Sequence, residues 1–376
     1  MPRRSAAALL LAGLAPVLEG VTPNNRVPKL IPPEGAWRGA ELGRQFLPPS
    51  SVGGAGKLAS FHAHYPQTPL HVYRSFNLTV GDDVRAWVAK GGILWYNIKT
   101  SKGMSWQRGA EGGFDAEAAG WAAQVKSLAP AQVFVVVFHE PDHNVCFTKC
   151  GGGGVPGNTP AHYRNMYARI QDVFRNASVT NAVWVMDYST QIANTSYIGA
   201  ECNAESCHPA AAVAPLWPGD DRVDWVFFNV FEKGKHDLTP KHDFNQIMAA
   251  SQAVLGSVSS SSAHCHCVKG KDKGCTGCNL GSKPWGLGAF ASHGGTDKAA
   301  KPVSVAERVR FLHDAAASAA APTNRSSHEL KAYLYFDSQD SEVAVNGSGP
   351  PAVDAAFRRY LATPAFAVND AGAPPH

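Results

Sequence analysis

VFVVVFHEPD, residues 133–142, is the stretch of the sequence that decides the fold. Its first six residues are apolar and mostly β-branched, which is typical of a strand buried on both faces. Such strands belong to parallel sheets, whose faces are covered by helices. His139, Glu140 and Asp142 follow at once, so polar side chains begin where the strand ends.

Similar apolar runs recur before and after this strand. They lie at residues 69–73, 92–98, 182–186, 223–228, 285–290 and 330–336. Between them, apolar residues at helical spacing predict helices over 116–128, 163–174 and 305–312. We expect the first strand near 42–46. This alternation, repeated seven or eight times over about 300 residues, predicts an α/β fold, and the closed (β/α)₈ TIM barrel is its economical form.

The composition of the 376-residue chain agrees with one large folded domain. Hydrophobic residues make up 44% and charged residues 17%, a mixture that fills a core and excludes a mainly disordered chain. The net charge of +4 is too small and too dispersed to indicate a nucleic-acid or membrane-surface partner. We find no linker that divides the domain, and we expect a monomer without a cofactor.

The N-terminus predicts entry into the secretory pathway. Two arginines precede an apolar stretch over 6–18, which is the order of a signal peptide and too short to span a bilayer. A disordered, alanine-rich tail is the alternative interpretation. We expect a signal peptide at 1–20, a proline-rich lead-in at 21–40 and the barrel at 41–370 of a secreted, extracellular protein. Sequons that fit this route are Asn77, Asn176, Asn194, Asn324 and Asn346.

The carboxyl ends of the strands are where a TIM barrel carries its chemistry. Glu140 lies at the end of the most apolar strand, directly after His139. A carboxyl group on the rim of such a strand suits a general acid. The alternative is a polar cluster that caps the strand and binds loop amides.

The pair His139-Glu140 resembles the His-Glu pair that bears the catalytic acid of glycoside hydrolase family 26, which contains mannanases and related endo-glycanases. Further stretches are similar to this family in the same order, at residues 181–185, 217–225, 283–292, 335–337 and 357–360. WPGDDRVDW at 217–225 resembles the entry to the sixth strand, and KPWGLGAFAS at 283–292 resembles the seventh. The likeness spans about residues 40–366 and implies a TIM-barrel hydrolase that acts on a polysaccharide.

One position departs from the family pattern. The family's nucleophilic glutamate falls at Ala289, and alanine cannot attack an anomeric carbon. A retaining enzyme needs a second carboxyl group about 5–5.5 Å from the acid, and an inverting enzyme needs one at about 6.5–9.5 Å. We expect Glu232 or Asp337 to supply it, with Asp187 behind them, unless the second group is absent. Alternatively, Glu232 is a solvated loop charge among lysines, and Asp337 accepts backbone hydrogen bonds at the rim.

Other residues near the predicted strand ends suit the binding of a sugar. Sugar rings stack on aromatic side chains, and their hydroxyl groups need polar partners. The candidates for substrate binding are His71, Trp106, His139, Tyr188, Trp217, Asn229 and His293. For the two tryptophans the alternative is a place in the core, where most tryptophans lie.

The eight cysteines fall into local sets. They are Cys146 and Cys150 after the His-Glu pair, Cys202 and Cys207 before the sixth strand, and Cys265, Cys267, Cys275 and Cys278 before the seventh. In an oxidising compartment we expect disulfides that pin long loops. The last set also has the ligand types and spacing of a zinc site, which stays the alternative.

Two functions are compatible with these patterns. The first is a secreted glycoside hydrolase with Glu140 as general acid and an atypical second carboxylate. The second is a degenerate barrel that kept the fold, lost the nucleophile and binds carbohydrate without catalysis. Fold alone does not decide between them. The presence of His139-Glu140 favours the hydrolase, and the distance between carboxyl groups is the measurement that discriminates.

Overall fold

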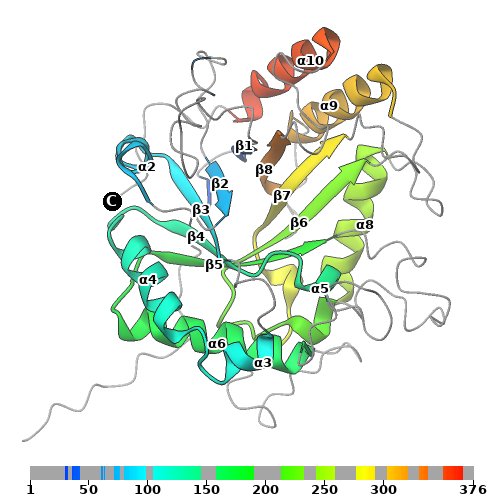
Figure 1. Ribbon diagram of the computed structural model, residues 1–376. Coiled ribbons are helices and arrows are strands. Elements are labelled where there is room, and N and C mark those ends of the chain that lie inside the picture. The colour runs from blue at the N-terminus through cyan, green and yellow to red at the C-terminus, as the bar shows by residue number, and fades with distance from the viewer. Residues whose placement is uncertain are drawn as a thin grey trace, which may run out of the picture.

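Eight parallel strands close into a barrel in this computed structural model (Figure 1). They are β1 (Trp37–Leu42), β2 (Val72–Phe76), β3 (Ile93–Ile98), β4 (Val133–Val137), β5 (Ala182–Ser189), β6 (Trp225–Glu232), β7 (Trp285–Ser292) and β8 (Leu330–Asp337). The strands follow one another in chain order, and β8 pairs with β1. Every neighbouring pair is parallel, so all carboxyl ends lie at one end of the barrel. The predicted (β/α)₈ TIM barrel is confirmed.

The structure describes most of the barrel and part of its connections. The described residues are 30–32, 36–42, 61, 63, 72–76, 80–98, 105–144, 158–189, 213–232, 243–258, 277–292, 303–320, 330–337 and 350–366. The predicted signal peptide and most of the predicted lead-in lie outside them.

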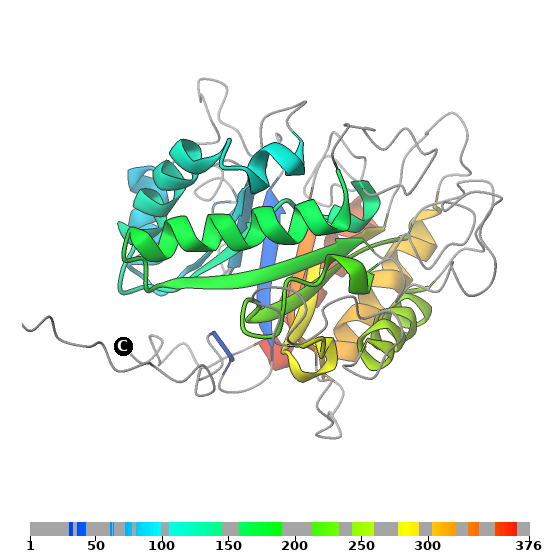
Figure 2. The same ribbon diagram turned by 90° about the horizontal axis from the view of Figure 1, so that it is seen from below.

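Helices alternate with the strands and lie outside the barrel, as Figure 2 shows for α6 alongside β5. The α-helices are α2 (Asp82–Val88), α3 (Trp106–Ala110), α4 (Asp115–Lys126), α5 (Pro141–Asn144), α6 (Pro160–Asn176), α8 (Phe244–Ser257), α9 (Val305–Ala320) and α10 (Pro351–Leu361). Short 3₁₀ helices are η3 (Ala214–Leu216), η4 (Leu280–Ser282) and η5 (Pro364–Phe366). The helices predicted over 116–128, 163–174 and 305–312 are confirmed as α4, α6 and α9.

The first strand begins earlier than predicted. β1 covers Trp37–Leu42 rather than 42–46, and residues 43–46 lie outside the described part of the chain. The sequence of β1, WRGAEL, forms no apolar run, so apolar content alone does not reveal it. The close packing of its backbone against β2 marks the strand instead. A Cβ on Gly39 would lie 2.7 Å from the carbonyl oxygen of Val72 on β2, and only glycine tolerates so close an approach.

Among the described residues, the buried side chains that fill the barrel interior come from the strands, and Leu30 packs against them. Trp225 and Phe227 stack with ring centroids 5.3 Å apart, and Trp95 meets Phe227 edge-on at 4.5 Å. Because side chains alternate along a strand, the inward row of β6 continues to Asn229, and that of β5 continues to Asp187. The packed interior therefore ends in a polar layer at the carboxyl ends of β5 and β6.

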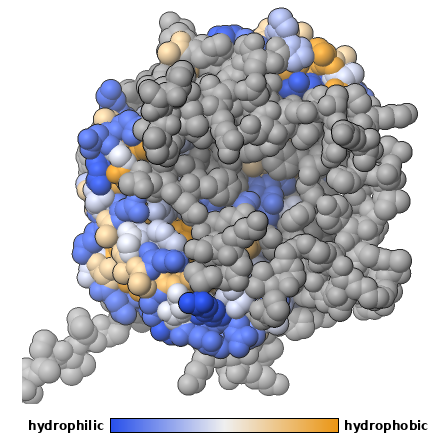
Figure 3. All heavy atoms as spheres, viewed as in Figure 1, coloured by the Kyte–Doolittle hydropathy of each residue, from blue (hydrophilic) through white to orange (hydrophobic). Residues whose placement is uncertain are grey.

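The described surface is mainly hydrophilic on the face shown in Figure 3. Among the described residues, the exposed large apolar side chains are Ile31 and Val305, which belong to distant parts of the chain. Within the same ranges, every helix falls short of the combined length and apolar character that a membrane span requires.

Candidate active site

The turn after β4 carries Glu140 and is held between two neighbouring strands. Phe138 and Glu140 both adopt left-handed backbone conformations, with φ of 59° and 51°. Such conformations cost about 1–3 kcal/mol each in non-glycine residues, so surrounding contacts must maintain them. The N–H of Phe138 donates to the carbonyl oxygen of Ile98 on β3 at 2.8 Å. The N–H of Glu140 donates to the carbonyl oxygen of Asp187 on β5, also at 2.8 Å. The turn is thus fixed from both sides.

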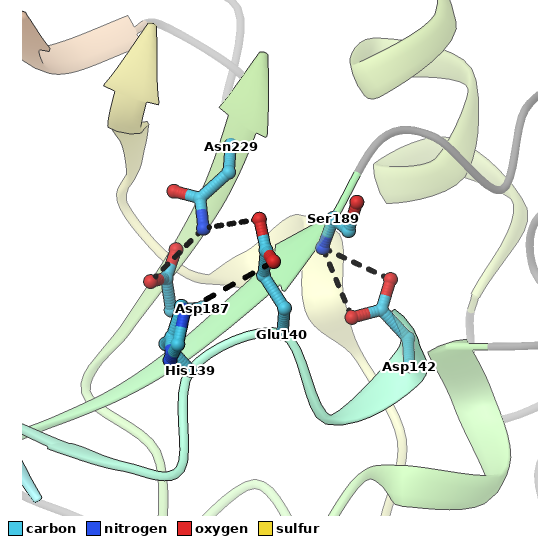
Figure 4. Close-up of polar contacts among 6 residues, drawn as sticks. All are labelled: His139, Glu140, Asp142, Asp187, Ser189 and Asn229. Carbon is cyan, nitrogen blue, oxygen red and sulfur yellow. Dashed lines mark hydrogen bonds and ion pairs between the residues drawn. The ribbon is translucent and has the colours of Figure 1, made fainter. Parts of the chain in front are cut away.

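Glu140 and Asp187 share one amide group (Figure 4). Asn229 on β6 donates through Nδ2 to Oε1 of Glu140 at 3.0 Å and to Oδ2 of Asp187 at 3.4 Å. The Glu140 side chain is 19% exposed, whereas Asp187 and Asn229 are each 1% exposed. Two carboxyl groups from neighbouring parts of the barrel therefore converge on one buried amide, and Glu140 is the more accessible of the two.

His139 lies next to this pair. Its Nε2 atom is 4.0 Å from Oε2 of Glu140, and its side chain is 17% exposed. The contact is an ion pair only when the imidazole is protonated. His139 therefore flanks the accessible carboxyl group, and its contact with substrate stays a prediction.

Asp142, in the first turn of α5, is a third carboxyl group close to the pair. It is 4% exposed, and both its oxygens accept from the backbone N–H of Ser189 on β5, at 2.9 Å each (Figure 4). Burial raises the pKa of Asp142 well above its usual range, against the opposing effect of the Ser189 hydrogen bond. The negative charges of Glu140 and Asp187 raise this pKa further.

Protein stability should depend on pH through Asp142. Since its pKa is raised in the folded state, the stabilising contribution is fully present below about pH 4, the usual aspartate pKa, and is lost as pH rises through the folded-state pKa. Asp142→Asn has no proton to lose there. We therefore expect the free energy of unfolding of this variant, relative to that of the wild type, to increase between about pH 4 and pH 8. Urea unfolding of both proteins across this range measures the effect, and parallel pH profiles contradict it.

Three aromatic residues predicted to bind substrate are buried instead. Trp106 opens α3 and packs against Tyr163 with ring centroids 5.0 Å apart, while Trp217 donates to Oδ1 of Asp220 at 2.9 Å. Tyr188 lies within β5. All three predicted residues are 0% exposed, and a sugar ring stacks only on an exposed aromatic face. Their burial contradicts these predictions, and the rings pack between the barrel and its helices.

The remaining predicted residues are Asn229, Glu232, Asp337, His71 and His293. Asn229 is in the site itself. Glu232 is the last residue of β6 and Asp337 the last of β8, and the structure describes their backbone positions only. Their roles as second carboxylate therefore stay predictions. His71 and His293 lie outside the described residues.

Asp187 is the acidic residue that the structure does bring to Glu140. The signal that would have ranked it above Glu232 and Asp337 is the alternation in β5, where Val183 and Val185 face the interior and the same row continues to Asp187. The sequence pattern suggests that Asp187 follows the strand, and for a residue outside the strand the alternation does not say whether its side chain points into the barrel. β5 in fact runs on to Ser189.

Ala289, where the resemblance places the family's nucleophile, also lies close to this site. It is 3% exposed, and its backbone on β7 is the register partner of Asn229 on β6. On the other side of β6, Asn229 pairs with Ser189 of β5. The amide that holds Glu140 thus stands between the strand with the alanine and the strand with Asp187.

Metal ligands do not gather in the described part of the chain: no group of three or more His, Cys, Asp or Glu residues there could hold an ion. Cys278 is 0% exposed and disulfide-bonded, and its partner lies outside the described residues. A disulfide sulfur is not a thiolate ligand, so Cys278 is not available to a four-cysteine zinc site. The pairing of the other cysteines stays a prediction.

Comparison with known proteins identifies the fold. No family model matches the chain, and no curated protein is similar to it in sequence. The family 26 glycoside hydrolase domain of an endo-β-mannanase/endo-β-glucanase from Prevotella bryantii is similar in structure, with a TM-score of 0.54, 12% identity and coverage of 89% of this chain and 90% of that one. A family 26 β-mannanase from Bacteroides ovatus gives a TM-score of 0.50, 12% identity and the same coverages. The chain is therefore a (β/α)₈ barrel with the fold of these family 26 glycoside hydrolases.

Proposed function

We propose that this chain is a glycoside hydrolase that cleaves O-glycosyl bonds of a polysaccharide, with Glu140 as general acid and Asp187 as second carboxylate. One observation carries the proposal: the amide nitrogen of Asn229 lies 3.0 Å from Glu140 and 3.4 Å from Asp187. Two carboxyl groups that converge at the carboxyl end of a TIM barrel are the equipment that glycoside hydrolysis requires.

The spacing of the two groups favours a retaining mechanism. Inverting enzymes separate their carboxyl groups by about 6.5–9.5 Å to admit water, and retaining enzymes by about 5–5.5 Å. Oε1 of Glu140 and Oδ2 of Asp187 lie 3.0 and 3.4 Å from the same nitrogen, so these two oxygens are at most about 6.4 Å apart, below the inverting range. Glu140, the more exposed group, protonates the leaving oxygen while Asp187 attacks the anomeric carbon. Water, deprotonated by Glu140, then releases the sugar from Asp187.

We infer a β-linked polysaccharide as substrate. The structures of similar fold described above are named for β-mannanase and endo-β-glucanase activity. At 12% identity this supports a class of substrate rather than one polymer. Mannan, β-1,3-xylan and mixed-linkage glucan therefore form the set to be tested.

A second function is favoured by Ala289. An alanine at the position of the family's nucleophile, beside Asn229, suits a barrel that binds carbohydrate without cleaving it. In such a protein, Glu140 and Asp187 would accept hydrogen bonds from sugar hydroxyl groups rather than exchange protons with them.

Turnover and binding, measured together, separate the two functions. The full chain is incubated with each of the three polysaccharides, new reducing ends are counted, and binding is followed by affinity electrophoresis. We expect reducing ends from at least one polymer. Binding without new reducing ends contradicts the hydrolase and supports the binding protein, and the absence of both contradicts the two proposals together.

We also propose that the protein is secreted. The order of charge and apolar residues at 1–20 supports this, and so does the sequon at Asn176, which is exposed at the end of α6. Expression in a eukaryotic host tests it: the protein should reach the medium without its first residues and carry a glycan at Asn176. Retention in the cell with an intact N-terminus contradicts the proposal.

A further inference from the structure

The segment that carries Glu140 is joined to β5 at two points. The N–H of Glu140 donates to the carbonyl oxygen of Asp187 at 2.8 Å. Two residues further along both segments, Asp142 accepts the N–H of Ser189 with both carboxyl oxygens, at 2.9 Å each. Figure 4 shows this second contact beside the Glu140 carboxyl group. Since β4 ends at Val137, these bonds continue the contact with β5 beyond the regular ladder.

The backbone between the two strands needs this support. Phe138 and Glu140 are both in left-handed conformations, which side chains of this size leave when nothing holds them. Helix α5 spans only Pro141–Asn144, and so short a helix does not hold its own position. The buried side chain of Asp142 therefore anchors a segment that has little stability of its own.

We propose that Asp142 is a positioning residue of the candidate active site: its bond to β5 fixes the turn that carries Glu140 and thereby sets the distance from that carboxyl group to Asp187. Both carboxyl oxygens of Asp142 accept the backbone N–H of Ser189, so it acts through Glu140 and not on the substrate. The inference rests on the proposed function, because it assigns a purpose to the spacing of the two carboxyl groups.

The role requires an acceptor oxygen rather than a charge. The donors are neutral backbone N–H groups, those of Ser189 and of Asp142 itself, and burial disfavours the ionised form of Asp142. Among the described residues, the titratable groups that interact with it are Glu140, Asp187, Tyr163 and Tyr188. Each of these is acidic, so a negative charge at position 142 gains nothing from them. Asparagine has the same shape and one acceptor oxygen, so it should preserve the positioning role when it replaces Asp142.

Kinetics of two variants and a matched control test the role. We expect Asp142→Ala to lower kcat by about 10²-fold with KM changed less than about 3-fold, since a small misplacement of a catalytic group has that effect. Asp142→Asn should stay within about 3-fold of the wild type, because the acceptor remains. Should the alanine variant not fold, Asp142→Ser, whose acceptor is shorter, should show the same loss in kcat.

The control is Asp224→Ala. Asp224, which directly precedes β6, accepts the N–H of Trp184 on β5 at 2.8 Å. This contact also joins a carboxyl group to β5, but it lies at the amino end of β6, away from the candidate site. We expect this variant to have a lower Tm and a kcat within about 2-fold of the wild type. If Asp142→Ala behaves like this control, or if Asp142→Asn loses as much as Asp142→Ala, the inference is overturned.

Crystal structures of the wild type and of both Asp142 variants give a readout that does not depend on turnover. The contact from Nδ2 of Asn229 to Oε1 of Glu140, 3.0 Å in the wild type, should be lost in Asp142→Ala and kept in Asp142→Asn. Its persistence in the alanine variant contradicts the positioning role. A wild type without hydrolase activity contradicts the proposed function and leaves this structural comparison decisive for Asp142.

Discussion

Replacement of Glu140 by glutamine is expected to lower kcat on the polysaccharide by about 10²–10⁴-fold, the contribution that a general acid typically makes. Glutamine has the same shape and keeps an oxygen that accepts from Nδ2 of Asn229, so the site should retain its geometry. What it lacks is the proton that the leaving glycosidic oxygen requires. The loss should therefore fall on kcat and leave binding of the polysaccharide close to that of the wild type.

A second substrate shows whether the missing proton is the cause. An aryl glycoside of the same sugar with a dinitrophenolate leaving group needs little protonation, so the kcat/KM of Glu140→Gln, which reports the first step, should fall far less on it than on the polysaccharide. Thermal unfolding of both proteins is the control for folding. Equal activity of variant and wild type on the polysaccharide, or equal losses on both substrates, contradicts the assignment of Glu140 as general acid.

The strands that can be predicted from sequence are those whose apolar runs coincide with their structure. β3, β4 and β7 are buried along their whole length, and each reads as a nearly continuous apolar stretch. β1 does not, because Arg38 and Glu41 interrupt it and its packing depends on how closely Gly39 approaches β2. That approach is a property of the assembled barrel, which no local pattern contains.

The candidate site could be predicted only in part for the same reason. Glu140 directly follows an apolar strand, so its place on the rim is a local property. The nearness of Asp187 depends on how far β5 extends and on the register that places Asn229 between the two strands. Trp106 resembles a loop residue in sequence, yet Ser105 caps a helix there and the ring is enclosed by Phe138 and other aromatic side chains. Burial of this kind depends on partners far apart in the sequence.

Asp187→Asn is expected to lower kcat by about as much as Glu140→Gln, on the order of 10²–10⁴-fold, because an amide neither attacks an anomeric carbon nor takes a proton from water. Asparagine keeps an oxygen for Asn229, so the change removes reactivity rather than shape. Glu232→Gln and Asp337→Asn are the matched variants, since each makes the same change at the end of another strand. We expect each of them to lose less than about 10-fold. A large loss confined to one of these two would move the second carboxylate to β6 or β8.

Azide distinguishes a nucleophile at position 187 from a general base. Asp187→Ala leaves room for this small anion, which should attack the anomeric carbon while Glu140 protonates the leaving oxygen, and the glycosyl azide formed should have the configuration opposite to that of the substrate. The wild type should first release a sugar of retained configuration, which ¹H NMR detects before mutarotation. An inverted first product, or no rescue by azide, contradicts a nucleophile on β5. Rescue would also explain how the chain can do without a carboxylate at Ala289. Asn229 on β6 lies between β5 and β7, and its amide binds Asp187 on the β5 side. Asp187 would then supply from β5 the nucleophile that the family pattern places on β7.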